Sequence, residues 1–151
     1  MKIFKLEKLR ENEDLKKKDI ANKLNISNSI YSRWENNKSN IPTERLIQIA
    51  NLFKVNIDYI LDLTNSKIEI ISNNEINKKI IGQRIKKIRE NENLTLRNLA
   101  QILNTSSSTI SAYETGKTLI LECFLYEICK KYNYSSNWIL GRSDEMFIKN
   151  K

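Results

Sequence analysis

Apolar side chains recur along this chain every three or four residues, which is the spacing of one face of an α-helix. In the first half the pattern predicts helices at about residues 4–12, 16–24 and 28–36. A fourth helix, capped by Thr43, runs to Phe53, and a short fifth starts at Asn56. Three glycines and one proline leave few interruptions. The sequence therefore predicts an all-α fold.

The same pattern recurs 79 positions later. The segment Ser27–Lys38 is echoed by Ser106–Lys117, with Ser, Glu and Lys at matching offsets and an aromatic residue before each Glu. The echo extends over five predicted helices, each set with its own apolar stripes, so it is too long for a solenoid unit. We expect two tandem five-helix domains, at 1–66 and 75–145, joined by a linker at 67–74 and followed by a tail at 146–151.

Local signals predict where several helices begin and end. Asn25, Asn37 and Asn104 stand at turns that need a positive φ, and Gly116 replaces Asn37 in the second copy. Ser72 and Glu75 form a capping-box pattern, which predicts a long helix from about 73–75. The preceding K-I-E-I-I is compatible with a short strand, although a tether with apolar contacts fits it better.

The composition limits which catalytic and metal-binding functions the chain can have. The chain has no histidine, which removes the commonest general base and metal ligand. Cys123 and Cys129 lie six apart in a helical pattern, match no zinc or redox motif, and are expected to be structural thiols. We therefore expect no catalytic site, metal or cofactor. With no signal peptide and no long apolar run, a cytoplasmic protein that does not enter membranes is expected.

A formal charge of +8 favours an anionic partner such as a nucleic acid. An alternative origin of this charge is an AT-rich genome, which enriches Lys and Asn without any function.

The motif A-x3-N-x5-[YI]-x2-[WY]-E, at Ala21–Glu35 and Ala100–Glu114, resembles the helix-turn-helix of the lambda-repressor-like (Xre/Cro-type) DNA-binding domains. The segments Leu46–Ala50 and Trp138–Asp144 also look like this family. The usual turn glycine is Asn in both copies. The resemblance implies a transcriptional regulator, with a repressor expected, which binds double-stranded DNA in the major groove through the third helix of each domain. Phage, mobile-element and toxin–antitoxin regulators share the fold.

The resemblance also assigns roles to individual residues. Two ion pairs, Arg10 with Glu35 and Arg89 with Glu114, are expected to be internal supports and not DNA contacts. Lys17 and Leu96 occupy a position where the family commonly has Gln, which puts that DNA contact in doubt. The candidate DNA contacts are Lys16, Lys17, Lys18, Ser27, Asn28, Ser29, Ser32, Arg33 and Lys38 in the first copy, and Thr95, Arg97, Ser106, Ser107, Ser108, Thr109, Ser111 and Lys117 in the second.

The residue types explain these candidates. Asn bonds adenine and Arg bonds guanine, whereas short hydroxyl side chains fit close to base edges. Three lysines at a helix N-terminus oppose the helix dipole, so an external phosphate is a natural partner for them. An ordinary solvated helix surface is the alternative interpretation of both groups.

The two copies differ at their exposed positions, where Asn28 and Arg33 correspond to Ser107 and Ala112. Two non-identical half-sites are therefore expected. The ten residues 65–74 reach at most about 33–36 Å, which matches the roughly 34 Å between successive major grooves. As an alternative, the second copy is a protein-interaction or dimerisation module. A homodimer is possible, through Ile68, Ile70 and Ile71 or through Met146, Phe147 and Ile148, unless these residues pack on their own domain. The operator and any effector are not predictable.

Overall fold

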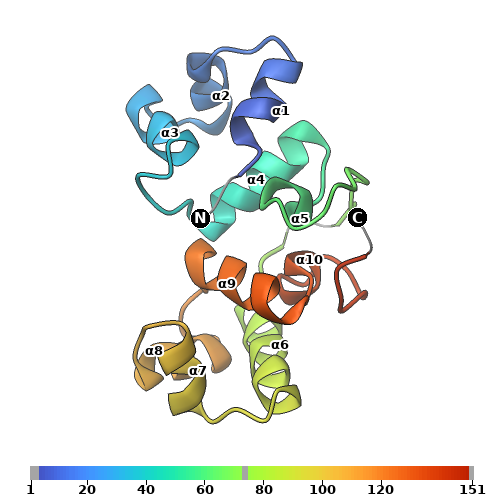
Figure 1. Ribbon diagram of the computed structural model, residues 1–151. Coiled ribbons are helices and arrows are strands. Elements are labelled where there is room, and N and C mark those ends of the chain that lie inside the picture. The colour runs from blue at the N-terminus through green and yellow to red at the C-terminus, as the bar shows by residue number, and fades with distance from the viewer. Residues whose placement is uncertain (1–3, 73–74, 150–151) are drawn as a thin grey trace. The chain divides into compact units, whose positions relative to one another are not determined.

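The computed structural model describes residues 4–72 and 75–149 and contains ten α-helices within them (Figure 1). The chain divides into two compact units, one formed mainly by the residues up to Ile70 and the other spanning Ile71–Ile148. We call them repeat 1 and repeat 2. The described residues contain no β-strand apart from one isolated bridge, between Tyr134 and Phe147. The predicted all-α fold with two tandem domains is confirmed.

Repeat 1 consists of five helices. They are α1 (Leu6–Asn12), α2 (Lys17–Leu24), α3 (Asn28–Glu35), α4 (Thr43–Phe53) and α5 (Ile57–Ile60). Their apolar faces meet in one core, which contains the buried side chains of Leu6, Leu9, Ile20, Leu24, Tyr31, Trp34, Leu46, Ile49, Phe53, Ile57 and Ile60.

Repeat 2 has the same helix order. Its helices are α6 (Lys78–Asn91), α7 (Leu96–Ile102), α8 (Ser107–Glu114), α9 (Glu122–Tyr132) and α10 (Ser136–Ile139). The first helix is longer than its counterpart, with 14 residues in α6 against 7 in α1. The core contains Ile81, Ile85, Ile88, Leu99, Leu103, Ile110, Tyr113, Leu125, Ile128, Cys129, Trp138 and Ile139.

The turns between helices follow the predicted backbone. Asn25 and Asn104 have φ of 57° and 56°, and Asn37 has φ of 56°. Gly116, which replaces Asn37, has φ of 78°. Asparagine tolerates this left-handed region better than most residues, and glycine adopts it without steric cost.

Two predicted helix starts are wrong. The capping box at Ser72 and Glu75 does not start α6, because the Asn77 side chain accepts the hydrogen bond from Ile80 N at 3.1 Å and α6 begins at Lys78. Thr43 does not cap α4 but is its first residue. Pro42 takes the cap position, and its carbonyl accepts hydrogen bonds from the first helical turn.

A return segment follows the fifth helix of each repeat. In repeat 2, Ser135 N donates to Met146 O at 2.8 Å and Ile148 N donates to Asn133 O at 3.0 Å, while Phe147 stacks on Tyr134. In repeat 1, the Asn56 side-chain amide donates to Ser66 O and Ile68 O. Residues 146–148 therefore pack on their own repeat. No strand forms at K-I-E-I-I, where Ile68 and Ile71 are mostly exposed.

A cation joins the first helix to the fifth in both repeats. Lys5 Nζ lies 4.0 Å from the centre of the Tyr59 ring and donates to Thr64 O at 3.1 Å. The equivalent Arg84 lies 5.0 Å from the centre of the Trp138 ring and donates to Ser143 O at 3.1 Å. These contacts combine cation–π attraction with a hydrogen bond. The repeats thus share internal contacts as well as helix order.

Candidate nucleic-acid interface

In each repeat the candidate interface lies on two helices joined by a tight turn. These are α2 and α3 in repeat 1, and α7 and α8 in repeat 2. In repeat 1, Asn25 ends α2, and Ile26 N donates to Ala21 O at 2.9 Å across the turn. In repeat 2, Thr105 N donates to Ala100 O at 2.8 Å. Buried residues on the inner faces of the two paired helices fix the angle between them. The outer faces of α3 and α8 therefore stay exposed.

A serine precedes α3 and α8 and caps each of these helices. Ser27 Oγ accepts from Ile30 N, and Ser106 Oγ accepts from Thr109 N, each at 3.2 Å. Such a cap stabilises a helix by about 1 kcal/mol. The first turns of α3 and α8 are therefore ordered at the surface, where a ligand can contact them.

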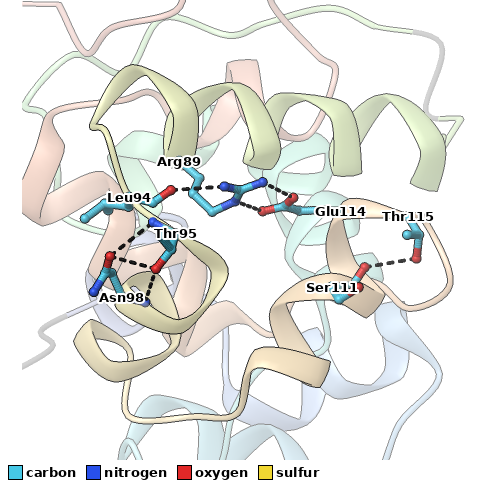
Figure 2. A network of polar contacts seen from close by, with 7 residues as sticks. All are labelled: Arg89, Leu94, Thr95, Asn98, Ser111, Glu114 and Thr115. Carbon is cyan, nitrogen blue, oxygen red and sulfur yellow. Dashed lines mark hydrogen bonds and ion pairs between the residues drawn. The ribbon is translucent and has the colours of Figure 1, made fainter.

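An ion pair holds the other end of α3 and of α8. Arg10 Nε and Nη2 donate to the Glu35 carboxylate at 2.7 and 3.2 Å. Arg89 binds Glu114 in the same two-bonded way, at 2.7 and 3.0 Å, as Figure 2 shows. The hydrogen bond to the carboxylate raises the pKa of each arginine above its ordinary value.

Each arginine also donates to the loop before the helix pair. Arg10 Nη1 lies 2.9 Å from Leu15 O, and Arg89 Nη1 lies 3.0 Å from Leu94 O. One guanidinium thus links the first helix, the loop before the second helix and the end of the third. All four ion-pair residues point inward, since the side chains of Glu35 and Glu114 are 2 % and 7 % exposed.

The outer face of α3 in repeat 1 is mostly polar, although Ile30 is 44% exposed there. Asn28, Ser29 and Arg33 are exposed and Ser32 is half-buried. Arg33 Nη2 donates to Lys38 O at 3.1 Å, so its guanidinium lies over the C-terminal turn of α3. A contact between Arg33 and a base requires the side chain to leave this position.

The lysines at the start of α2 do not behave alike. Lys16 holds the cap position and Lys18 is exposed. Lys17 reaches across to α3, where its Nζ donates to Ser32 Oγ at 3.3 Å. Asp19 accepts from Lys16 N at 2.8 Å and supplies a negative charge in this first turn. The unfavourable interaction with the helix dipole is therefore partly offset within α2.

Repeat 2 pairs most of its interface hydroxyls locally. Ser106 Oγ lies 3.0 Å from Ser108 Oγ and 2.8 Å from Thr109 Oγ1. The Thr95 hydroxyl donates to Asn98 Oδ1 at 2.7 Å and accepts from Asn98 N (Figure 2). Residue Ala112 is half-buried, and the exposed candidates are Thr95, Arg97, Ser106, Ser107, Ser108 and Lys117.

Two supporting contacts have no counterpart in the sequence prediction. Arg45 Nη1, on α4, donates to Leu24 O at 2.7 Å and so fixes the end of α2. This contact lies beside an open groove of about 620 Å³ between α2 and α4, whose lining includes Lys23, Asn25 and Gln48. Phe124 replaces Arg45 in repeat 2 and contacts Tyr113 instead. A sequence alignment of the two repeats shows this exchange but not its partners.

The second unpredicted contact is a close approach of α6 to α8. A Cβ on Gly82 would stand 2.5 Å from the Glu114 carbonyl oxygen and closer still to that of Tyr113. A Cβ on Gly116 would meet Lys78 and Lys79 backbone atoms at 3.2 Å. A glycine inside a predicted helix is the sequence signal that could have indicated this approach.

A disulfide, a cluster of metal-ligating side chains and a membrane-spanning helix are all absent from the described residues. Cys123 and Cys129 are not joined by a disulfide. Within residues 4–72 and 75–149, no three Asp, Glu or Cys side chains gather as a metal site requires. No helix in the same ranges combines the length and apolar character needed to cross a bilayer.

Comparisons with known proteins agree with this geometry. A helix-turn-helix domain family matches residues 4–66 and, a second time, residues 82–145. The HTH-type transcriptional regulator ImmR of Bacillus subtilis (strain 168) is 29% identical over 96 residues, which are 62% of this chain and 72% of ImmR. The uncharacterized HTH-type transcriptional regulator YobD of the same organism is 34% identical over 61 residues. This match covers 40% of the chain but only 54% of YobD, about half its length.

Among solved structures, the clp gene regulator ClgR from Corynebacterium glutamicum is similar in part. The match covers 43% of this chain and 69% of ClgR, with 23% identity and a TM-score of 0.39.

Proposed function

This chain belongs to the helix-turn-helix domain family, with two tandem copies of the Xre type, and we infer that it regulates transcription by binding double-stranded DNA. The observation that carries the inference is the duplicated helix pair, which in each repeat presents a serine-capped, polar helix at the surface. An α-helix of this kind fits the major groove of B-DNA. We further propose that the protein acts as a repressor.

In this proposal α3 and α8 contact base edges. Asn28 and Arg33 supply the long polar side chains of repeat 1, and the short hydroxyl side chains of both helices approach the bases closely. The cations at the edge of each face, such as Lys18, Lys38, Arg97 and Lys117, neutralise phosphates. Because the two faces differ, the preferred site is a pair of non-identical half-sites.

We also propose boundaries for the two DNA-binding modules. Repeat 1 acts as a module over residues 1–66 and repeat 2 over 75–145. The tether between them is shorter than a ten-residue linker, because the Asn56 amide binds Ser66 and Ile68 to repeat 1. The contacts of residues 146–148 favour including them in the second module.

Binding of the intact protein to genomic DNA fragments, measured by fluorescence anisotropy at several salt concentrations, tests this function. Sequence-specific binding that weakens steeply with salt is expected, since each neutralised phosphate contributes a slope of about −0.9 in log K against log salt. Binding that is absent, or that ignores salt, would contradict the proposal.

The variant Arg33→Ala tests the assignment of repeat 1, because it places there the residue that repeat 2 has. If Arg33 bonds a guanine, affinity falls by roughly 5- to 150-fold and selectivity relaxes at one base pair. If it bonds only phosphate, affinity falls equally for all sequences and the salt slope drops by about one. Lys8→Ala, on the exposed side of α1, is the matched control and should leave binding unchanged.

Repression itself is tested with a reporter gene placed behind a promoter that contains the selected site. Expression should fall when the protein is produced and recover with Arg33→Ala. Increased expression would refute the repressor role without affecting the DNA-binding assignment.

A second candidate function for repeat 2 is binding of another protein. Ile102 and Leu121 are 41% and 45% exposed, where repeat 1 has Lys23 and Pro42. Contiguous apolar patches are typical of interaction surfaces, and these two side chains are apolar positions that repeat 1 lacks. Separate binding assays on residues 1–66 and 75–151 distinguish the two functions, because a pure interaction module would bind no DNA.

A further inference from the structure

The first residue of the second helix differs in chemical type between the repeats. It is Lys17 on α2 and Leu96 on α7, and both side chains are half-buried. Lys17 Nζ reaches Ser32 Oγ on the outer side of α3 at 3.3 Å. A side chain at this position therefore lies where the two helices meet at the candidate interface. The equivalent position of repeat 2 carries an isobutyl group in place of an ammonium.

Several hydroxyl groups of the candidate interface in repeat 2 already bond to one another or to Asn98. The Ser106 hydroxyl lies 3.0 Å from that of Ser108 and 2.8 Å from that of Thr109. The Thr95 hydroxyl is engaged with Asn98 on both its donor and acceptor sides. Arg33, which supplies a long donor in repeat 1, corresponds to Ala112. Repeat 2 thus combines self-paired hydroxyls with apolar carbon at its surface.

We propose that Leu96 is a specificity-determining residue of repeat 2, which selects thymine in its half-site by contact with the C5-methyl group. The inference rests on the proposed function, namely DNA binding by both repeats. Thymine is the only base with a methyl group in the major groove. A leucine side chain offers no hydrogen bond to the N7, O6, O4 or N4 groups there, so the methyl group is its one favourable partner.

The size of the effect follows from burial of one methyl group. Removing such a group from water favours binding by about fourfold. A half-site with two contacted thymines would therefore be preferred by about sixteenfold over the same half-site without the methyl groups.

The test uses the full-length protein and a DNA site obtained by selection from random sequence. Deoxyuridine replaces thymidine in one half-site at a time, which removes the methyl group and keeps base pairing. The half-site whose selectivity changes with Arg33→Ala belongs to repeat 1, and the other belongs to repeat 2. We expect affinity to fall about fourfold per contacted thymine in the repeat 2 half-site, and this fall to require Leu96.

Two variants assign the effect to Leu96. Leu96→Ala should bind thymine and deoxyuridine sites equally. Leu96→Lys, which installs the residue of repeat 1, should also lose this discrimination and steepen the salt dependence by about one phosphate. Fluorescence of Trp138, measured in a Trp34→Phe background, checks that repeat 2 remains folded in both variants, because this buried side chain belongs to repeat 2.

Three results would overturn the inference. One is equal affinity for thymine and deoxyuridine in the repeat 2 half-site. Another is unchanged discrimination in both Leu96 variants. The third is selection of a single half-site, which would show that repeat 2 specifies no bases and favour its role as an interaction module. If selection enriches no sequence at all, the proposed function fails first, and this outcome is visible before any deoxyuridine is introduced.

Discussion

The Arg89–Glu114 ion pair is expected to stabilise repeat 2 strongly against loss of one partner but weakly against loss of both. The informative change is Arg89→Met, which retains most of the side-chain volume and removes the charge. It leaves the Glu114 carboxylate, whose side chain is 7% exposed, without its two donors, and leaves Leu94 O without the Arg89 hydrogen bond.

The expected loss of unfolding free energy in Arg89→Met lies between two limits. An exposed pair contributes up to about 1 kcal/mol, whereas removing one partner of a buried pair costs about 3–5 kcal/mol. With Arg89 15% exposed and Glu114 less so, the geometry is close to the buried limit. We expect Arg89→Met to reduce the free energy of unfolding of repeat 2 by about 3 kcal/mol. The double variant Arg89→Met/Glu114→Leu should recover most of this loss, because no buried charge remains.

The assay exploits a tryptophan in each repeat. Trp34 and Trp138 are the only two in the chain, and both are buried, 4% and 5% exposed. Urea unfolding is followed by fluorescence in a Trp34→Phe background, where the signal comes from repeat 2 alone. A Trp138→Phe background reports repeat 1 and serves as the control.

The reasoning is refuted if Arg89→Met changes the Trp138 transition by less than about 0.5 kcal/mol, within the usual scatter of surface substitutions. It is also refuted if the double variant is no more stable than the single one. An equal shift of the Trp34 transition would show that the loss is not confined to repeat 2.

Three further predictions use the same two fluorescence reporters. The buried Tyr31 hydroxyl lies beside the Arg10–Glu35 pair but makes no hydrogen bond of good geometry. Tyr31→Phe should therefore keep the stability of repeat 1 or raise it by about 1 kcal/mol, and a loss above about 1 kcal/mol would contradict this. Burial raises the pKa of Tyr31 above the ordinary 10.0. The folded repeat 1 therefore has its full stability below about pH 10 and loses part of it as the pH rises further. Urea titrations at alkaline pH should show a smaller loss in Tyr31→Phe. Gly82→Ala should destabilise repeat 2 by about 1–3 kcal/mol through overpacking against α8 backbone, and an unchanged Trp138 transition would show that α6 shifts freely.

The sequence predicts best those features that depend on neighbouring residues. The apolar spacing places all ten helices, and asparagine marks several of the left-handed turns because it accepts a positive φ better than most residues. Asp14, Lys54 and Asp62 also have a positive φ, without that signal. The repeat itself adds a second, independent copy of each signal. This is why Gly116, aligned with Asn37, identifies a positive φ at both positions.

Predictions fail where several residues offer the same local signal or where the partner is distant in sequence. Ser72 and Asn77 are both residue types that can cap a helix, and in the structure Asn77 caps α6. The contact of Arg45 with Leu24 O depends on how α4 crosses α2, and local propensity does not encode it. The local pairing of the Ser106 and Thr95 hydroxyls is likewise visible only in three dimensions.

The close approach of α6 to α8 has a consequence for changing DNA specificity by mutation. Position 116 follows the candidate recognition helix of repeat 2, and any side chain there must displace the backbone of Lys78 and Lys79. The aligned position of repeat 1 already carries a side chain, that of Asn37. A mutational library around α3 should therefore contain more folded members than the same library around α8. New binding specificities are best sought first in repeat 1, with repeat 2 kept as the constant partner.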